Sequence, residues 1–492
     1  MKAINMPPDA PTLMWSTRAI GYTTPAAVAD LIDNSISAKA TKVEIEFSSG
    51  ENEFVSILDN GVGMCPEELC QAMKYGSGNP WIERQESDLG RFGLGLKTAS
   101  LSQCRKLTVA SKQNGSISAY CWDLDHVIRV RKWELLELDH NEMDSIPQIH
   151  KLSQYDEGTI VLWNNLDKMC AGDEDKEKGL LIKIKEVEEH LAITFHRYLQ
   201  GEQGLRRLTI TSNGIQIKAN DPFFVTRSDE MPTEKIPVKY ISKDGIEKKD
   251  NVTVTPFILP FSDSLTQEEM TSLGGKDGLV KNQGFYIYRN KRLIVAAEWF
   301  RLTRKTDLSK LCRVRVDMPN TLDEIWTIDV KKSMAIPPEV VLRSLRRIVA
   351  PIINAGKRKY KFRATRETSK DHMQVWTPRE TRNGVLYTIN PEYPVYREVL
   401  NSVKDRQKFL SLIRIIEQNL PVNAIHSDFY NDVKYAFEDV DIALQNTMKN
   451  LRDLLKDVSP EQRKDEFDEL MTIMPFAEYD IKLEDLGEID HG

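Results

Sequence analysis

Asp30 and Asn34 are the residues whose types and spacing best suit chemistry in this 492-residue sequence. They stand four positions apart in the stretch AVADLIDNS, and residues i and i+4 share one face of a helix. A carboxylate and an amide on one face suit ATP hydrolysis, in which the carboxylate orients the attacking water and the amide holds Mg²⁺ on the phosphates. Because such a pair is common by chance, it has this meaning only beside a nucleotide site.

The stretch that carries the pair has the pattern of a helix packed on a sheet. Thr24 and Pro25 suit the start of that helix as its cap and its first residue. Apolar residues then follow with helical spacing over positions 27–36. Alternating apolar residues over 41–47 and 53–61 predict two strands joined by a turn.

Asp59 ends the second of these strands and begins the run DNGVGM. Gly61 and Gly63 let the backbone approach a flat ligand, and the carboxylate accepts a hydrogen bond. The exocyclic amine of adenine is such a donor. An ordinary Asp-Asn-Gly turn is the alternative interpretation.

A second glycine-rich run, GRFGLG over 90–95, leads into the predicted helix LKTASLSQ. Glycines that open a helix can cradle phosphates through backbone N–H groups, although this spacing is neither that of the P-loop nor that of the dinucleotide fingerprint. Lys97 offers a phosphate contact, with a solvated lysine as the alternative. Thr159 opens a later strand, where it either shares the adenine contact or simply fills a strand position.

These motifs stand in the order AVADLIDNS, LDNGVGM, GRFGLGLKTAS and GTIVLWNNL. In that order they resemble the GHKL ATPases, which include DNA gyrase, the large heat-shock chaperones, histidine kinases and MutL, and they are most similar to the MORC-type branch. The resemblance covers roughly residues 15–170. It implies a mixed α+β and α/β protein that begins with a Bergerat-fold ATPase sandwich, in which helices cover one face of a mixed sheet and ATP lies between.

The resemblance also assigns roles to the motif residues. Asn34 would bind Mg²⁺, Asp59 would read adenine with support from Thr159, and Gly63 would floor the base pocket. The second glycine-rich run would hold the phosphates, and residues 75–92 would form a lid over ATP. The implied nucleotide-binding residues are Asn34, Asp59, Gly61, Gly63, Met64, Gly90, Gly93, Leu94, Gly95, Lys97, Thr98 and Thr159.

Asp30 departs from the family pattern, because the water-orienting residue of these ATPases is usually Glu. Asp is one methylene shorter, so its carboxylate lies about 1.5 Å further back. General-base geometry is sensitive at that scale. Either the backbone compensates, or a second carboxylate such as Asp33 helps, or hydrolysis is slow. We expect a working but slow ATPase.

Strand patterns recur beyond residue 200 and are followed by a helix over 337–355. This order resembles the transducer domain that follows the ATPase in gyrase, MutL and MORC-like proteins, an α/β fold similar to ribosomal protein S5. Helical patterns dominate after residue 367. The predicted domains are an ATP-binding domain over 1–200, a transducer over 201–366 and a mainly helical module over 367–492.

In those relatives a transducer lysine reaches the γ-phosphate. Lys331 and Lys332, in the stretch DVKKS between the last strand and the helix, are the candidates here. If this lysine contacts only the γ-phosphate of a triphosphate, the domains would close with ATP and not with ADP. A solvated lysine pair at a strand end is the alternative.

Two basic stretches are candidates for contacts with a DNA backbone, although the net charge is −7. Charge runs are usually solvated faces. The stretches comprise Arg343, Arg346, Arg347, Lys357, Arg358, Lys359, Lys361, Arg363 and Arg366, and Arg289, Lys291, Arg292, Arg301, Arg304 and Lys305.

The remaining composition narrows the setting. No run of about 18 apolar residues is present, and the first residues do not form a signal peptide. The six Cys form no CxxC pair, which argues against structural zinc and a disulfide framework. These features predict a cytoplasmic protein with reduced cysteines and no membrane contact.

The function expected from these patterns is an ATP-operated clamp. ATP and Mg²⁺ would close the lid and bring two copies together, with residues 1–24 as a strap across the homodimer and DNA as the client. A role in restriction or antiviral defence would follow by analogy.

Three alternatives stay open. A chaperone-like ATPase would need an exposed apolar client surface. A histidine kinase would need a phosphoacceptor helix before the ATPase. An ATP-gated scaffold that hydrolyses slowly or not at all is made credible by Asp30. Whichever of these functions holds, residues 367–492 would bind a protein partner or a second copy of the chain.

Overall fold

A computed structural model gives the fold of the chain, which forms two compact units, residues 1–356 and 357–492. The predicted boundaries at 200 and 367 do not coincide with this division, and the three-domain arrangement stays a prediction. The structure describes residues 6, 8–19, 21–50, 52–76, 95–169, 172, 175–241, 245–261, 264–323, 325–328, 335–367, 373, 375–381, 384–421, 440–456, 458–460, 462–472, 476 and 481–487.

The first unit contains an eight-stranded sheet in the order β5-β4-β3-β6-β2-β1-β7-β8. Neighbours pair antiparallel except β1 and β7, which pair parallel, so the sheet is mixed as predicted. Its strands are β1 (Lys42–Ser48), β2 (Phe54–Asp59), β3 (Lys106–Gln113), β4 (Ser116–Asp123), β5 (Leu136–Glu137), β6 (Gly158–Asn164), β7 (Thr209–Ser212) and β8 (Ile215–Gln216).

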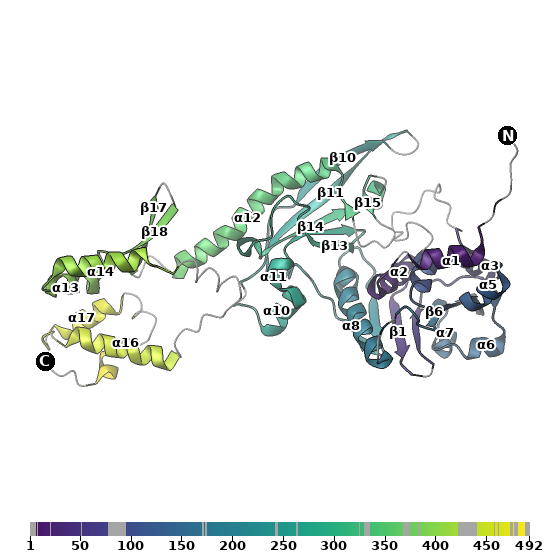
Figure 1. Ribbon diagram of the computed structural model, residues 1–492, viewed down its shortest axis with the longest axis horizontal. Coiled ribbons are helices and arrows are strands. Elements are labelled where there is room, and N and C mark those ends of the chain that lie inside the picture. The colour runs from purple at the N-terminus through teal and green to yellow at the C-terminus, as the bar shows by residue number, and fades with distance from the viewer. Residues whose placement is uncertain are drawn as a thin grey trace. The chain divides into compact units, whose positions relative to one another are not determined.

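Helices cover this sheet on both faces (Figure 1). The larger layer packs on one face, as predicted, and comprises α1 (Ala10–Arg18), α2 (Thr24–Ser37), α3 (Pro66–Met73), α4 (Gly95–Leu101), α5 (Leu124–Val130), α8 (Lys176–Thr194) and α9 (His196–Gln200). The short helices α6 (His140–Asp144) and α7 (Ile149–Gln154) cover part of the opposite face, an addition to the predicted arrangement.

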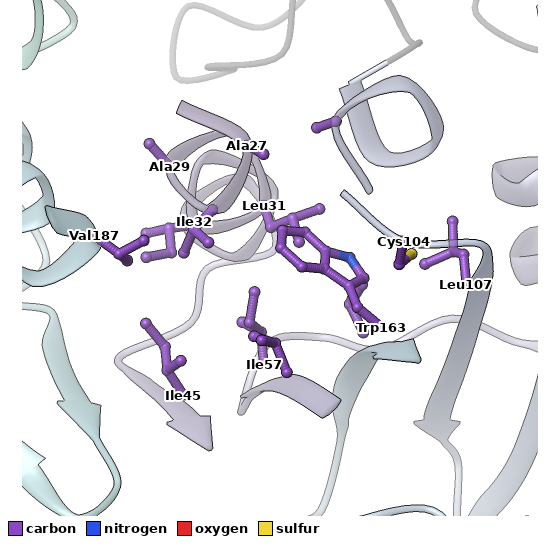
Figure 2. Close-up of a cluster of buried hydrophobic side chains, with 14 of the residues drawn as sticks. Ala27, Ala29, Leu31, Ile32, Ile45, Ile57, Cys104, Leu107, Trp163 and Val187 are labelled. Carbon is purple, nitrogen blue, oxygen red and sulfur yellow. The ribbon is translucent and has the colours of Figure 1, made fainter. Parts of the chain in front are cut away.

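Helix α2 is the central element of the larger layer. Figure 2 shows Leu31 and Ile32 of this helix beside Ile57 and Trp163 of the sheet, all within 2% exposed. The helix also packs on α8 and α4. Its cap is Thr23, whose Oγ1 accepts a hydrogen bond from the Ala26 N–H at 3.4 Å. The helix therefore begins at Thr24, one residue earlier than predicted.

A six-stranded sheet also lies in the first unit, in the order β10-β11-β14-β12-β13 with β9 beside β11. Strands β12 and β13 form an antiparallel hairpin within this sheet. The strands are β9 (Asp229–Glu230), β10 (Glu234–Ile241), β11 (Glu247–Ile258), β12 (Gly284–Arg289), β13 (Arg292–Glu298) and β14 (Cys312–Met318). Further elements are α10 (Gln267–Gly274), η2 (Gly275–Asp277), α11 (Gly278–Lys281), η3 (Asp307–Ser309), η4 (Asn320–Leu322), β15 (Thr327–Ile328), β16 (Ala335–Ile336) and α12 (Glu339–Glu367).

The second unit is mainly helical, as predicted, with one added hairpin. Its buried side chains, among them Leu451, Leu455 and Phe467, form a core of their own. The elements are β17 (Trp376–Thr381), β18 (Gly384–Ile389), α13 (Pro394–Ser402), α14 (Arg406–Gln418), α16 (Val440–Leu455), α17 (Arg463–Leu470) and η6 (Leu483–Leu486). Across the described part of the chain, no helix has the length and apolar content needed to cross a membrane.

Candidate nucleotide site

Asp30 and Asn34 both lie on α2, one turn apart, which confirms their predicted placement on one helix. The two side chains differ in surroundings, because Asp30 is 3% exposed whereas Asn34 is exposed. The Tyr22 hydroxyl donates to Asp30 Oδ2 at 2.9 Å and orients that carboxylate. A Cβ placed on Gly95 would lie 3.5 Å from the same oxygen, so the first residue of α4 faces Asp30.

Arg292 approaches the same turn of α2 from β13 of the other sheet. Its Nε donates to Asp33 Oδ1 at 3.2 Å, and its Nη2 lies 3.9 Å from Asp30 Oδ1. Asp33 is 0% exposed and is the anchor of a buried ion pair with Arg292. The suggestion that Asp33 helps to orient water stays a prediction.

Asp59 ends β2 as predicted, and its carboxylate is 7% exposed. Oδ2 accepts a hydrogen bond from Ser35 Oγ at 2.7 Å, and Oδ1 accepts one from the Gly61 N–H at 2.9 Å. Burial raises the pKa of Asp59, while these hydrogen bonds and the Thr159 backbone oppose the rise. A buried carboxylate with fixed oxygens is suited to accept one further hydrogen bond from a bound base.

The loop after Asp59 leaves no room for a side chain at Gly63. Its φ is +61°, and a Cβ there would lie 1.9 Å from the Lys112 carbonyl oxygen of β3. The next residue, Met64, donates its N–H to Ser111 Oγ at 2.9 Å. Ser111 Oγ also lies 2.9 Å from Thr159 Oγ1. These contacts hold Gly61, Gly63 and Thr159 around the end of β2.

Thr159 is paired with Asp59 in the register of β6 and β2. This pairing is antiparallel, so the start of β6 lies beside the end of β2. The two residues proposed to share the adenine contact are therefore neighbours in the sheet, although about 100 positions separate them in the sequence.

Lys97 of α4 is neither solvated nor exposed. The side chain is 1% exposed, and its Nζ donates to the Ala72 carbonyl of α3 at 2.7 Å. Burial lowers the pKa of Lys97 to about 8. Thr98 beside it is also buried. The solvated alternative for Lys97 is thus wrong, and the phosphate contacts of Lys97 and Thr98 stay predictions.

Several predicted site residues lie outside the described residues. These are Gly90, Gly93 and Leu94 of the glycine-rich run, together with Lys331 and Lys332. Most of the predicted lid over 75–92 lies outside them as well. The roles assigned to these residues stay predictions.

The structure corrects the predicted DNA-facing basic stretch over 289–305. Arg289 is 4% exposed and binds Asp323 at 2.6 Å, and Arg292 is 3% exposed and binds Asp33. Neither is available to a phosphate backbone. The basic residues of the two stretches that are exposed among those with described side chains are Arg301, Arg304, Lys305, Arg343, Arg346 and Arg347.

Two open hollows flank the site. One, of about 790 Å³, is lined by residues that include Gly61 and Lys112, and the other, of about 820 Å³, by residues that include Tyr22 and His190. Gly61, which donates to Asp59, lines the first hollow, and Tyr22, which donates to Asp30, lines the second. Neither lining includes Asn34 or Asp59.

Sequence reasoning missed four polar groups that shape the site. Ser35 and Ser111 are ordinary in type, and Tyr22 precedes the predicted helix. Arg292 lies 259 positions from Asp33. The spacing of Asp30 and Asp33, three positions apart on one helical face, was the available sign that a cation lies opposite.

Comparison with known proteins points to one family. The model of the histidine kinase-, DNA gyrase B- and HSP90-like ATPases matches residues 22–159. A 95-residue stretch is 34% identical to ATPase morc-1 of Caenorhabditis elegans, over 19% of this chain and 11% of that protein. A 49-residue stretch is 45% identical to the DNA mismatch repair protein MutL of Kosmotoga olearia, over 10% of this chain and 8% of that protein.

The chain thus spans about a tenth of the length of these two relatives. Among solved structures, the ATPase domain of the mismatch repair endonuclease MutL from Aquifex aeolicus matches with a TM-score of 0.30 and 16% identity. That match covers 60% of this chain and 90% of the other. The family match over residues 22–159 contains all of the described polar groups around Asp30 and Asp59 except Arg292.

Proposed function

We propose that this chain binds ATP with Mg²⁺ and hydrolyses it slowly, because residues 22–159 match the model of the histidine kinase-, DNA gyrase B- and HSP90-like ATPases. One observation carries the proposal. Asp30 and Asn34 of α2, Asp59 of β2 and Thr159 of β6 lie on elements that are joined by the Ser35–Asp59 hydrogen bond and by the pairing of β2 with β6. Each has the chemistry that a nucleotide site needs.

The residues present fit ATP at its base end. The fixed oxygens of Asp59 suit the exocyclic amine of adenine, and the space beside Gly63 admits no side chain. Thr159 supports the contact from β6. The glycine-rich run with Gly95 at its end would receive the phosphates.

The residues also fit Mg²⁺ carried by ATP. Asn34 is an exposed polar residue of α2, one turn from Asp30, and its amide oxygen would hold the ion together with phosphate oxygens. Within the described residues, no group of three or more His, Cys, Asp or Glu side chains could hold a metal ion by itself. In this proposal the phosphates therefore supply the other ligands of the ion. When bound, Mg²⁺ neutralises developing phosphate charge.

Asp30 is the proposed water-orienting residue. Its carboxylate faces the start of α4, is shielded from solvent and is oriented by Tyr22. A water held between Asp30 and the γ-phosphate would lose its proton toward this carboxylate as it attacks. The short side chain argues for slow turnover.

We further propose that the chain works as a dimerising clamp on DNA in the cytoplasm. Among the described side chains of the two basic stretches, the exposed arginines of α12 and of the loop after β13 could contact a phosphate backbone. The relative named for DNA mismatch repair motivates DNA as the client. Antiviral defence as a setting rests only on analogy with the MORC-type ATPases that the motifs resemble. The five described cysteines are free, which suits a reducing compartment.

A protein client is the second candidate, because α14 carries an exposed apolar face. Leu412, Ile415 and Ile416 are 54%, 56% and 43% exposed and lie at helical spacing. Residues 367–492 would then bind a protein partner while the ATPase stays the same.

The decisive experiment measures phosphate release with and without duplex DNA across a salt series, on wild type and D30N. We expect slow release from wild type and at least a tenfold loss in D30N. Stimulation by DNA that fades with salt would support the DNA client. Equal release from both proteins would remove Asp30 from its role, and a rate indifferent to DNA would shift weight to a protein client.

A further inference from the structure

A single arginine of the second sheet holds two acidic residues of the ATPase helix. Arg292 opens β13 and donates through Nε to Asp33 Oδ1 at 3.2 Å. Its Nη2 lies 3.9 Å from Asp30 Oδ1. All three side chains are buried, with exposures of 3%, 0% and 3% for Arg292, Asp33 and Asp30. Residues outside the family match thus reach the proposed catalytic carboxylate.

The guanidinium itself is held in place on its own side. Nη1 donates to the Leu293 carbonyl at 3.0 Å, and the guanidinium carbon lies 5.9 Å from the centre of the Phe195 ring. His190 of α8 faces the same group, and burial followed by Arg292 lowers its pKa to about 4. At neutral pH His190 is therefore uncharged, and the positive charge opposite the two acids is that of Arg292.

We propose that Arg292 is a positioning residue for ATP hydrolysis, which fixes Asp30 through α2 and ties turnover to the seating of the second sheet. This inference rests on the proposed ATPase function. Asp30 and Asp33 are three positions apart and share one face of α2. By donating to Asp33 and lying beside Asp30, the planar guanidinium restrains the rotation of that helix turn and hence the direction of the Asp30 carboxylate.

The same guanidinium lies close enough to Asp30 to favour its charged form. A buried carboxylate tends to take up a proton, and a nearby cation favours the ionised form. Asp30 must be ionised to accept a proton from water. Loss of Arg292 would leave Asp30 less ionised and less firmly held, but would leave Asp59 and Asn34 in place.

Arg289 provides a matched control on the same hairpin. It ends β12, is 4% exposed and binds Asp323 at 2.6 Å. It is thus a buried, ion-paired arginine whose carboxylate partner lies on the second sheet's own side. Removing it should disturb the hairpin to a similar extent without touching α2.

The test compares wild type, R292Q, R292K and R289Q for folding, ATP affinity and turnover against pH. For R292Q we expect kcat to fall about 10- to 100-fold, while the Kd for a fluorescent ATP analogue changes less than about threefold. The acid limb of its kcat profile should move to higher pH. R292K keeps the charge without the fork, so it should restore the acid limb but only part of kcat. R289Q should keep kcat within about twofold.

Two results are distinguishable as failures. If wild type binds ATP but releases no phosphate, the proposed hydrolysis is wrong, and the positioning role of Arg292 is wrong as well. If wild type is active and R292Q matches R289Q in kcat and pH profile, the positioning role alone is overturned. Should R292Q not fold, R292K against R289Q gives the same comparison.

Discussion

At the scale of single residues, one turn of α2 places two polar groups in opposite surroundings. Asp30 is buried and receives the Tyr22 hydroxyl, whereas Asn34 is exposed. A metal ion on a nucleotide must approach its ligand from solvent, while a carboxylate that handles a proton acts more strongly where water is excluded. The division therefore suits the two roles proposed for them.

Replacement of Asp59 by Asn should separate nucleotide binding from stability. An amide keeps the acceptor for the Gly61 N–H and removes a carboxylate whose pKa is raised by burial. In D59N without nucleotide we expect the free energy of unfolding to change by about 1 kcal/mol or less. ATP affinity should fall roughly 10- to 100-fold, because a charge-assisted hydrogen bond to adenine is lost. Calorimetric titration with ATP and urea unfolding measure the two quantities; unchanged affinity would remove Asp59 from the site.

The buried amine of Lys97 gives a pH dependence of known sign. Its pKa is lowered from 10.5 to about 8 by burial, so the unfolded chain binds more protons between these values. The contribution of Lys97 to the free energy of unfolding therefore rises with pH in that window, by at most about 1.4 kcal/mol per pH unit. Without nucleotide, the unfolding free energy of wild type should increase relative to that of K97M between about pH 8 and about pH 10. Parallel profiles for the two proteins would contradict the burial of this amine.

At the scale of elements, the site depends on how tightly the loop after β2 meets β3. Gly63 has a φ of +61° and its backbone lies so close to Lys112 that a Cβ would overlap the carbonyl at 1.9 Å. The contact brings Met64 to Ser111 and hence to Thr159. One glycine thus connects three elements of the site.

Alanine at Gly63 should be far more damaging than alanine at Gly115. Both have a left-handed φ, but Gly115, in the β3–β4 hairpin, has nothing within 4 Å of a built Cβ. G115A should therefore cost only the backbone strain, about 1 kcal/mol. G63A must also shift β3 or its own loop, and we expect a loss of about 3 kcal/mol or more together with ATP binding. Urea unfolding of both variants tests this, and equal losses would contradict the close approach.

Local patterns were enough to predict the elements but not how distant ones meet. Helix α2, strands β1, β2 and β6 and the β12–β13 hairpin follow from periodicity and turn residues within each stretch. The pairing of Asp59 with Thr159 required the order of known motifs, since no spacing rule joins strands across 100 positions. The burial of Arg289 and Arg292 was not predictable, because a basic run has the same sequence pattern whether it faces solvent or an acid on another element.

At the scale of the first unit, its two sheets are joined by buried polar contacts instead of a purely apolar seam. Besides Arg292 and Asp33, Arg197 of α9 binds Asp317 of β14 at 2.5 Å, and the Tyr198 hydroxyl donates to the Asn290 carbonyl at 2.6 Å. Removing one partner of such a pair leaves a buried charge unmatched. A displacement of the second sheet would therefore be felt at α2, the helix that carries Asp30.

A dimerising clamp makes a prediction about mass that depends on the nucleotide. The 56.4 kDa chain should run as a monomer without nucleotide and at about twice that mass with Mg²⁺ and a non-hydrolysable ATP analogue. D30N should reach the dimer with ATP itself and hold it, because binding is kept while hydrolysis is lost. D59N should need roughly 10- to 100-fold more analogue than wild type to reach the dimer, since its affinity for the nucleotide that favours the closed state is lowered by that factor. Light scattering after gel filtration measures all three proteins, and a wild-type mass that does not change at saturating analogue would leave an ATPase without a clamp.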